Sequence, residues 1–283
     1  TLSSPTRVSL FCIKLNRYAL TEHVDDPTER EQLDLSKAEP LKGFPTSYSE
    51  LRYYDRCPYD YKLRFIYGFN PKIAMALGYG RAVHNILNII HTMSKEKTLT
   101  LEEVSAIVDE NFFLRYAPKS YMDIFKKSAE RVIGNYVDKF SEGFNLILET
   151  EKRFEFSLGD ALIFGSIDMI KKLNEEGEIE GIEIVDFKER DDSELATDYE
   201  KQLKLYAIAS LRALGLNPKK ATVHHLDEGT TSDVDISLEE LKKVEGNVEG
   251  EIRDIINRKF PKSAESKKCK DCDWKYICTK EMV

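Results

Sequence analysis

The chain has 283 residues, of which 41% are hydrophobic and 33% are charged, and this balance excludes a disordered protein. Its formal net charge of -8 argues against nucleic-acid binding over the whole surface, because phosphates are normally bound by Lys and Arg. The sequence shows neither an apolar run long enough to span a membrane nor the pattern of a signal peptide, so we expect a cytoplasmic protein with no membrane partner.

The first half of the chain is predicted to be mainly helical. Residues 1–45 have no clear period, and we interpret them as an extension or linker. A helical block is expected over residues 46–145, and it opens at SYSELRYYDRC, where Thr46, Ser47 and Glu50 form a candidate capping box. In GYGRAVHNILNIIHTM, apolar residues recur at helical spacing and place His84 and His91 together on a second stripe.

After Asn145 the period changes to two, which is typical of strands. ETEKRFEFSL, ALIFGSIDMIKKL and IEGIEIVDFKE are separated by turn signals and predict three consecutive antiparallel strands. A helix over 199–214, the strand ATVHHL, a turn through EGTTSD, the segment DVDIS and a helix over 238–259 follow. We therefore predict an α/β fold with one central mixed sheet flanked by helices, its core at 146–260, and a cysteine-rich tail at 261–283.

Two carboxylates and a lysine project from the predicted strands. In EIVDFKE the alternation puts Asp186 and Lys188 on one face of the sheet and Val185 and Phe187 on the other. Asp168 interrupts the apolar strand before it, and a buried carboxylate needs a partner or a metal. Such a set suits a hard divalent cation such as Mg²⁺. Alone, Asp-x-Lys on a strand is more often a solvated ion pair.

Three cysteines near the C-terminus, Cys269, Cys272 and Cys278, have the spacing C-x2-C-x5-C, which suits a metal ion or an iron-sulfur cluster. Such sites normally use four protein ligands, and the only other cysteines, Cys12 and Cys57, lie far upstream. In a reducing compartment these cysteines favour ligand chemistry over disulfides. The spacing leaves zinc and iron open as alternatives.

The C-terminal segment is basic although the chain is acidic. From Arg253 to Lys280 there are nine Lys or Arg against four Asp or Glu. An ordinary solvated face is one interpretation, and contact with DNA phosphates is the other. The candidates for the second are Lys267, Lys268, Lys270 and Lys275.

The order of four motifs resembles the RecB-like branch of the PD-(D/E)XK nucleases. These motifs are GxxxH (Gly80 to His84), GxxD (Gly165 to Asp168), DxK (Asp186 to Lys188) and QxxxY (Gln202 to Tyr206). The stretch SYSELRYYDRCPYDYKLRFIYGF looks like the opening helix of that branch. With the C-terminal cysteines it resembles the iron-sulfur version of the family, found in AddB-type nucleases and CRISPR-associated adaptation nucleases, over about residues 46–280.

The resemblance implies a restriction-endonuclease-like core and a deoxyribonuclease that depends on Mg²⁺ or Mn²⁺. It assigns the metal to His84, Asp168, Asp186 and the backbone carbonyl of Phe187. It implies that Lys188 holds the attacking water or stabilises the charge that develops on the phosphate. It also implies that Gln202 and Tyr206 orient the lysine or the DNA backbone. It also makes Cys57 the fourth ligand of a 4Fe-4S cluster with Cys269, Cys272 and Cys278.

From this resemblance we expect an exonuclease that acts on DNA ends or single strands in repair, recombination or processing, with a helicase subunit or domain as a candidate partner. Three alternatives stay open. They are a nuclease of CRISPR spacer acquisition, a non-catalytic DNA-binding scaffold with a structural cluster, and a Zn²⁺ protein with no nuclease role. The scaffold is disfavoured because Asp168, Asp186 and Lys188 are all present.

Overall fold

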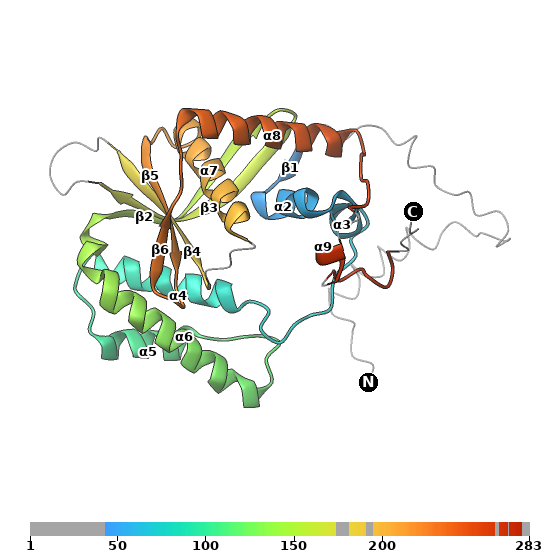
Figure 1. Cartoon of the computed structure of the whole chain (residues 1–283). Helices are drawn as coiled ribbons and strands as arrows, with labels where there is room; N and C mark the ends of the chain where they lie inside the picture. The colour runs from blue at the N-terminus through green and yellow to red at the C-terminus, as the bar shows by residue number, and fades with distance from the viewer. Residues whose placement is uncertain (1–42, 174–180, 191–194, 264–265, 271, 279–283) are drawn as a thin grey trace, which may run out of the picture. The chain divides into compact units, whose positions relative to one another are not determined.

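The computed structural model in Figure 1 describes residues 43–173, 181–190, 195–263, 266–270 and 272–278. The described residues all belong to one compact unit, Pro40–Val283. Most of the predicted extension over 1–45, together with Cys12, therefore lies outside the described residues.

A mixed sheet forms the centre of the described part. Its strands are β1 (Phe44–Thr46), β2 (Ile147–Leu158), β3 (Ala161–Lys172), β4 (Ile182–Lys188), β5 (Pro218–His225) and β6 (Thr230–Asp233). The order is β1-β3-β4-β5-β6, and β2 also pairs with β3. The pairs β1 with β3 and β4 with β5 are parallel, and the others are antiparallel. The predicted α/β class with a central mixed sheet is confirmed.

Helices cover both faces of this sheet (Figure 1). One layer contains α2 (Tyr48–Arg56), α3 (Pro58–Tyr61), α7 (Ala196–Arg212) and α8 (Leu238–Ile256), and the other contains α4 (Tyr79–Ser94), α5 (Leu101–Asn111) and α6 (Lys119–Phe140). Shorter segments are the π-helix η2 (Lys62–Ile66), the 3₁₀-helix η3 (Ser141–Leu146) and α9 (Ser266–Lys270). No described helix is long and apolar enough to cross a membrane.

The central strand β4 separates two hydrophobic cores. Ile184 packs with α7 and α8, whereas Val185 and Phe187 pack with α4 and α6. Burial on both faces explains why this strand carries apolar residues on each of its two sides. Each large side chain buried in this way contributes about 1.5–3 kcal/mol relative to exposure.

The start of α2 differs from the prediction. The helix follows Ser47, as expected, but the Ser47 side chain makes no capping hydrogen bond with a described residue. The Thr46 hydroxyl instead donates to Glu50 Oε2 over 3.1 Å. Thr46 is fully buried and belongs to β1, a short strand that the sequence did not predict, so the pairing of β1 with β3 decides its environment.

The segment EGTTSD, predicted as a turn, contains strand β6. The turn comes earlier, at residues 226–229, where Gly229 adopts a φ of +63°, and Thr230 then opens the strand. Glycine reaches this conformation readily, and β-branched threonines favour strands, so the hairpin closes at the glycine. The polar threonines are strand residues here, and the prediction that they form the turn is wrong.

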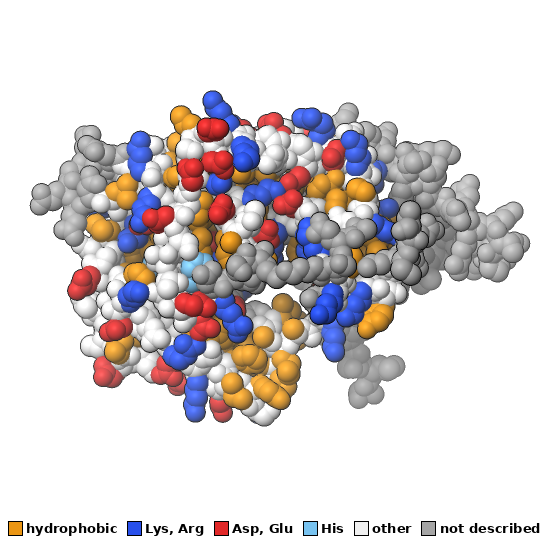
Figure 2. Space-filling model, viewed as in Figure 1, with side chains coloured by type: hydrophobic (Ala, Val, Ile, Leu, Met, Phe, Trp, Pro, Cys, Tyr) orange, Lys and Arg blue, Asp and Glu red, His pale blue; other side chains and the backbone are white. Residues whose placement is uncertain are grey.

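Charged side chains of both signs are mixed over the face that Figure 2 shows, and hydrophobic side chains gather in its lower part. The net charge of -8 is therefore not spread as one acidic field over this face.

Candidate active site

The candidate site forms where β3 and β4 stop pairing. On one edge of β3, β1 pairs at one end and β4 at the other, and the pairing with β4 ends at Met169 and Val185. Asp168 lies directly beyond that pair, and its Oδ2 accepts a hydrogen bond from the backbone N–H of Phe187 over 2.8 Å. A side chain thus takes the place of a ladder bond and fixes Asp168 against the end of β4.

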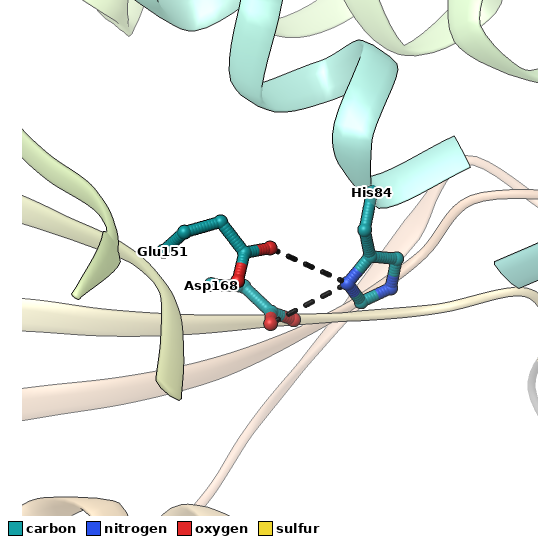
Figure 3. A group of neighbouring side chains, drawn as sticks. All are labelled: His84, Glu151 and Asp168. Atoms are coloured by element: carbon teal, nitrogen blue, oxygen red, sulfur yellow. Dashed lines mark ion pairs between the residues drawn. The ribbon is translucent and has the colours of Figure 1, made fainter. Parts of the chain in front are cut away.

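Asp168 belongs to a group of three side chains from three elements, His84 from α4, Glu151 from β2 and Asp168 from β3 (Figure 3). His84 Nδ1 lies 3.4 Å from Asp168 Oδ1 and 4.0 Å from Glu151 Oε1. The three ligand atoms lie within 4.8 Å of one another, and all three residues are partly buried. One imidazole nitrogen and two carboxylate oxygens can hold a divalent cation.

Glu151 is the member of this group that sequence reasoning missed. Its neighbours Thr150 and Lys152 pair with Met169 and Ile167, which puts Glu151 opposite Asp168. The signal was present, because the turn at Gly159 sets the register and counting back from it reaches the same pair. Glu151 also has a φ of +48°, a conformation that is strained for a residue with a side chain.

A second set of contacts begins on β4. Asp186 and Lys188 lie on the same face, as the alternation predicted, and Lys188 Nζ is 2.5 Å from Asp186 Oδ2. Lys188 donates to Gln202 Oε1 on α7 over 3.0 Å, and Gln202 Nε2 donates to Tyr206 Oη over 2.7 Å. The four residues therefore form one continuous polar chain from the strand to the helix.

The pKa values follow from burial and from charge at short range. Burial acts to lower the pKa of His84, but the Asp168 carboxylate outweighs it and raises that pKa to about 9. Burial acts to raise the pKa of Asp168, but His84 and Lys188 hold it below its usual range. Burial raises the pKa of Asp186 to about 6, opposed by Lys188 and reinforced by Asp168. A proton on His84 thus compensates the crowded carboxylates.

These donors fit a divalent cation. Asp186 Oδ2 is buried and lies close to the Lys188 ammonium, yet it makes no aligned hydrogen bond with a described residue, so it has spare capacity as an acceptor. The carbonyl of Phe187, an expected metal ligand, lies 3.1 Å from His84 Nε2. A cation bound among the carboxylates would take over the charge compensation that the His84 proton provides.

The four described cysteines line one cavity of about 190 Å³. Burial raises the pKa of the Cys272 thiol, and Cys57 is close enough to raise it further. Among the described residues, however, no three cysteine sulfurs lie mutually within 4.8 Å, since the His84 group alone meets that distance.

The cavity is held together by contacts between the first helices and the C-terminal segment. Asp60 accepts hydrogen bonds from Trp274 Nε1 over 2.5 Å and from Arg64 over 2.6 Å, and Arg64 also pairs with Asp273. The Arg56 guanidinium donates to the carbonyl of Lys268. These contacts bring Cys57 to a tail more than two hundred residues away, which no local pattern in the sequence predicts.

Three of the four tail lysines have described side chains, and that of Lys267 lies outside the described residues. Lys270 and Lys275 are exposed, and Lys268 is partly buried at the cysteine cavity. Lys275 Nζ donates to the Lys270 carbonyl over 3.4 Å. The structure thus leaves at least two tail cations open to solvent.

Comparison with known proteins identifies the family of the chain. Residues 45–279 match the model of the PD-(D/E)XK nuclease superfamily. A solved structure of a Eubacterium rectale protein named "Putative exonuclease" is similar with a TM-score of 0.50 at 16% identity, over 84% of this chain and 90% of that one. The protein SSO0001 gives a TM-score of 0.41 at 16% identity, over 98% of each chain. No curated protein matches the chain.

The fold and the site define an α/β protein in which an acidic group, a candidate metal site, lies beside a lysine at the opening of a mixed sheet. The family match covers most of the chain, and the chain belongs to the PD-(D/E)XK nuclease superfamily.

Proposed function

We propose that this protein is a metal-dependent deoxyribonuclease. One observation carries the proposal: Asp168, held by the Phe187 N–H, brings the His84 and Glu151 group beside the Asp186 and Lys188 pair at the opening between β3 and β4. A solvated Asp-x-Lys pair would need neither a third carboxylate nor an imidazole next to it.

The metal is Mg²⁺ or Mn²⁺, held by Asp168, Asp186 and His84, with Glu151 as an added carboxylate and the Phe187 carbonyl as a further oxygen. When bound, the cation supplies positive charge for the phosphate and lowers the pKa of a bound water. Hydrolysis then forms a bond from the water oxygen to phosphorus and breaks a bond from phosphorus to a sugar oxygen. One water proton passes to the leaving sugar oxygen.

Lys188 supplies the remaining positive charge. Its ammonium lies between Asp186 and Gln202, so its position is fixed before the substrate arrives. A fixed cation stabilises the negative charge that develops on the phosphate without reorganisation. Gln202 orients the lysine, and Tyr206 orients Gln202, as positioning residues.

The substrate is DNA with an end or a single-stranded part, and the mode of cleavage is exonucleolytic. These proposals rest on the resemblance to the RecB-like branch, as does a role in repair, recombination or processing with a helicase subunit or domain as partner. In the tail, the residues that contact DNA phosphates are Lys268, Lys270 and Lys275, together with Lys267.

The cysteine cavity holds a 4Fe-4S cluster in this proposal. Support for a four-cysteine site comes from the shared cavity, which Cys57, Cys269, Cys272 and Cys278 all line. The choice of iron over zinc rests on the resemblance to the iron-sulfur version of the RecB-like branch, because four thiolates suit either metal.

Substitution of Cys57 tests the cluster. The variant Cys57→Ala should lose the brown colour, the absorbance near 400 nm and most of the iron, while Cys12→Ala should keep all three. Purified protein with zinc and no iron would contradict the cluster, and so would a Cys57→Ala variant with full iron content.

Digestion of end-labelled DNA tests the activity. Linear and circular DNAs, each single-stranded and double-stranded, are incubated with Mg²⁺, with Mn²⁺ or with a chelator. We expect metal-dependent loss of linear DNA from its ends, faster for single strands, and intact circles. No cleavage of any substrate with either metal would overturn the proposed function.

A further inference from the structure

The end of η2 and the segment that joins it to α4 expose an unusual number of large hydrophobic side chains. We call residues 65–77 the aromatic loop. Six of its side chains are between 39% and 54% exposed: Phe65, Tyr67, Phe69, Ile73, Met75 and Leu77. Scattered exposed apolar residues need no explanation, but a contiguous set on one loop usually marks a binding surface.

The positive charges around this loop favour an anionic partner. Residues 62–81 contain Lys62, Arg64, Lys72 and Arg81 and no Asp or Glu, although the whole chain carries -8. Arg64 is held by Asp60 and Asp273. Lys72 and Arg81 are exposed and form no ion pair with a described residue, so their charge remains for a ligand.

The rings and the cations of this loop are interleaved. The ring centroids of Tyr67 and Phe69 are 6.0 Å apart, and Phe69 lies 6.2 Å from Trp274. Lys62 Nζ lies 5.2 Å from the centroid of the Tyr67 ring. Exposed rings accept the faces of unpaired bases whatever their sequence, and nearby cations bind the phosphates between them. Base pairs in a duplex leave no such faces free along the strand.

The aromatic loop also lies close to residues that neighbour the candidate active site. It leads into α4, whose first turn carries Arg81 three residues before His84, on the same side of the helix. Ala76 lines a cavity of about 230 Å³ together with Glu189, the residue after Lys188.

We infer that the aromatic loop is a stacking platform for single-stranded DNA, on which Tyr67 and Phe69 stack bases while Lys62, Lys72 and Arg81 contact phosphates. This inference deepens the proposed function and rests on it, because the platform guides the strand toward the group around His84. It assigns the preference for single strands to named residues outside the metal site.

The test compares ring-free, ring-keeping and apolar variants. In Tyr67→Ala/Phe69→Ala both rings are lost, in Tyr67→Phe/Phe69→Tyr both are kept, and in Tyr67→Leu/Phe69→Leu only the apolar character is kept. Tyr116→Ala is the matched control, since Tyr116 is an equally exposed tyrosine with Arg115 over its ring. Thermal melting verifies that each variant is folded.

Binding is measured by fluorescence anisotropy with a labelled oligothymidylate and with a blunt duplex, in the presence of a chelator so that cleavage cannot occur. We expect the Ala and Leu pairs to lose about tenfold or more in affinity for the single strand and little for the duplex. The ring-keeping pair and Tyr116→Ala should bind as the parent does. With metal, the Ala pair should raise KM and leave kcat unchanged.

Parent-like binding of the single strand by the Ala pair would overturn the platform, and so would full binding by the Leu pair, because leucine offers no ring for stacking. These results do not depend on cleavage. A parent protein that cleaves no DNA would instead overturn the proposed function, so the two failures are distinguishable.

Discussion

The backbone N–H of Phe187 donates its hydrogen bond to the side chain of Asp168 at the point where β3 and β4 stop pairing. The two strands therefore separate without leaving the N–H unsatisfied, and the opening exposes Asp168 to His84 on one side and to Asp186 on the other. An unpaired backbone donor in such a place would cost about as much as a lost hydrogen bond. The bond that holds the fold open is thus also the bond that positions the candidate metal ligand.

Glu151 gives the first prediction. In Glu151→Gln the side chain keeps its size but loses its charge, so we expect Mn²⁺ to bind about tenfold or more weakly, the scale seen when ligand-shell partners are removed. Titration calorimetry measures the affinity. Glu155→Gln is the matched control, since Glu155 is exposed on the same strand. Equal Mn²⁺ affinities for the two variants would show that Glu151 is not a ligand of the metal.

Tyr206 distinguishes a positioning role from a packing role. In Tyr206→Phe the ring remains in the core, but the hydroxyl that accepts from Gln202 is lost, so Gln202 no longer holds Lys188 in one orientation. We expect kcat to fall about tenfold with KM nearly unchanged. If the hydroxyl serves packing alone, only the free energy of unfolding should change, by about 1 kcal/mol, and kcat should stay at the parent value.

His84 and His91, which the sequence places on one stripe of α4, differ in their surroundings. His91 lies two turns further along α4 and is buried, with Nε2 3.0 Å from Tyr136 Oη and its ring stacked on Phe187. Helix α6 covers this part of the stripe, which periodicity within α4 alone cannot reveal.

Buried histidines give a prediction for the pH dependence of stability. Burial lowers the pKa of His91 from 6.5 to about 3 and that of His224 from 6.5 to about 4. As the pH falls below 6.5, the unfolded chain binds protons that the folded protein does not, so the free energy of unfolding falls. Asp186 acts in the opposite sense, because its raised pKa lets the folded protein take up a proton first.

The comparison of parent and His91→Phe isolates one histidine from these opposing effects. Between pH 7 and pH 5 the parent should lose about 2 kcal/mol more than the variant, at ~1.4 kcal/mol per pH unit below 6.5. Urea unfolding at the two pH values measures this difference. The variant will be less stable at pH 7, because Tyr136 loses its partner, but that loss is common to both pH values. Equal pH dependence would contradict a neutral buried His91.

Patterns with a short period were readable from the sequence. The alternation of β4 placed Asp186 and Lys188 on one face, and the switch from period 3.6 to period two located the three antiparallel strands. These features depend on neighbours in the chain, and local sequence specifies them directly.

Features that depend on distant partners were not readable in the same way. Strand β1 forms because Phe44 to Thr46 pair with the edge of β3. The approach of Cys57 to the tail depends on the contacts among Asp60, Arg64 and Trp274. Glu151 lies between these cases, since the hairpin register would have revealed it opposite Asp168. The motif resemblance supplied the association of Cys57 with the tail, because it carries information about distant parts of the chain, but it supplied neither β1 nor Glu151.

The most direct measurement of the central claim is the cleavage rate of the Lys188 variants on end-labelled linear single-stranded DNA with Mg²⁺. Lys188→Ala removes the cation that Asp186 and Gln202 hold in place, and Lys188→Arg keeps the charge beside the buried Asp186 but not the position of Nζ. Lys219→Ala, an exposed lysine on β5, is the control. Both Lys188 variants should remain folded and bind Mn²⁺ while cleavage falls about a hundredfold or more, equivalent to ~2.7 kcal/mol in the activation barrier. Cleavage by Lys188→Ala at the parent rate would contradict the proposed nuclease mechanism.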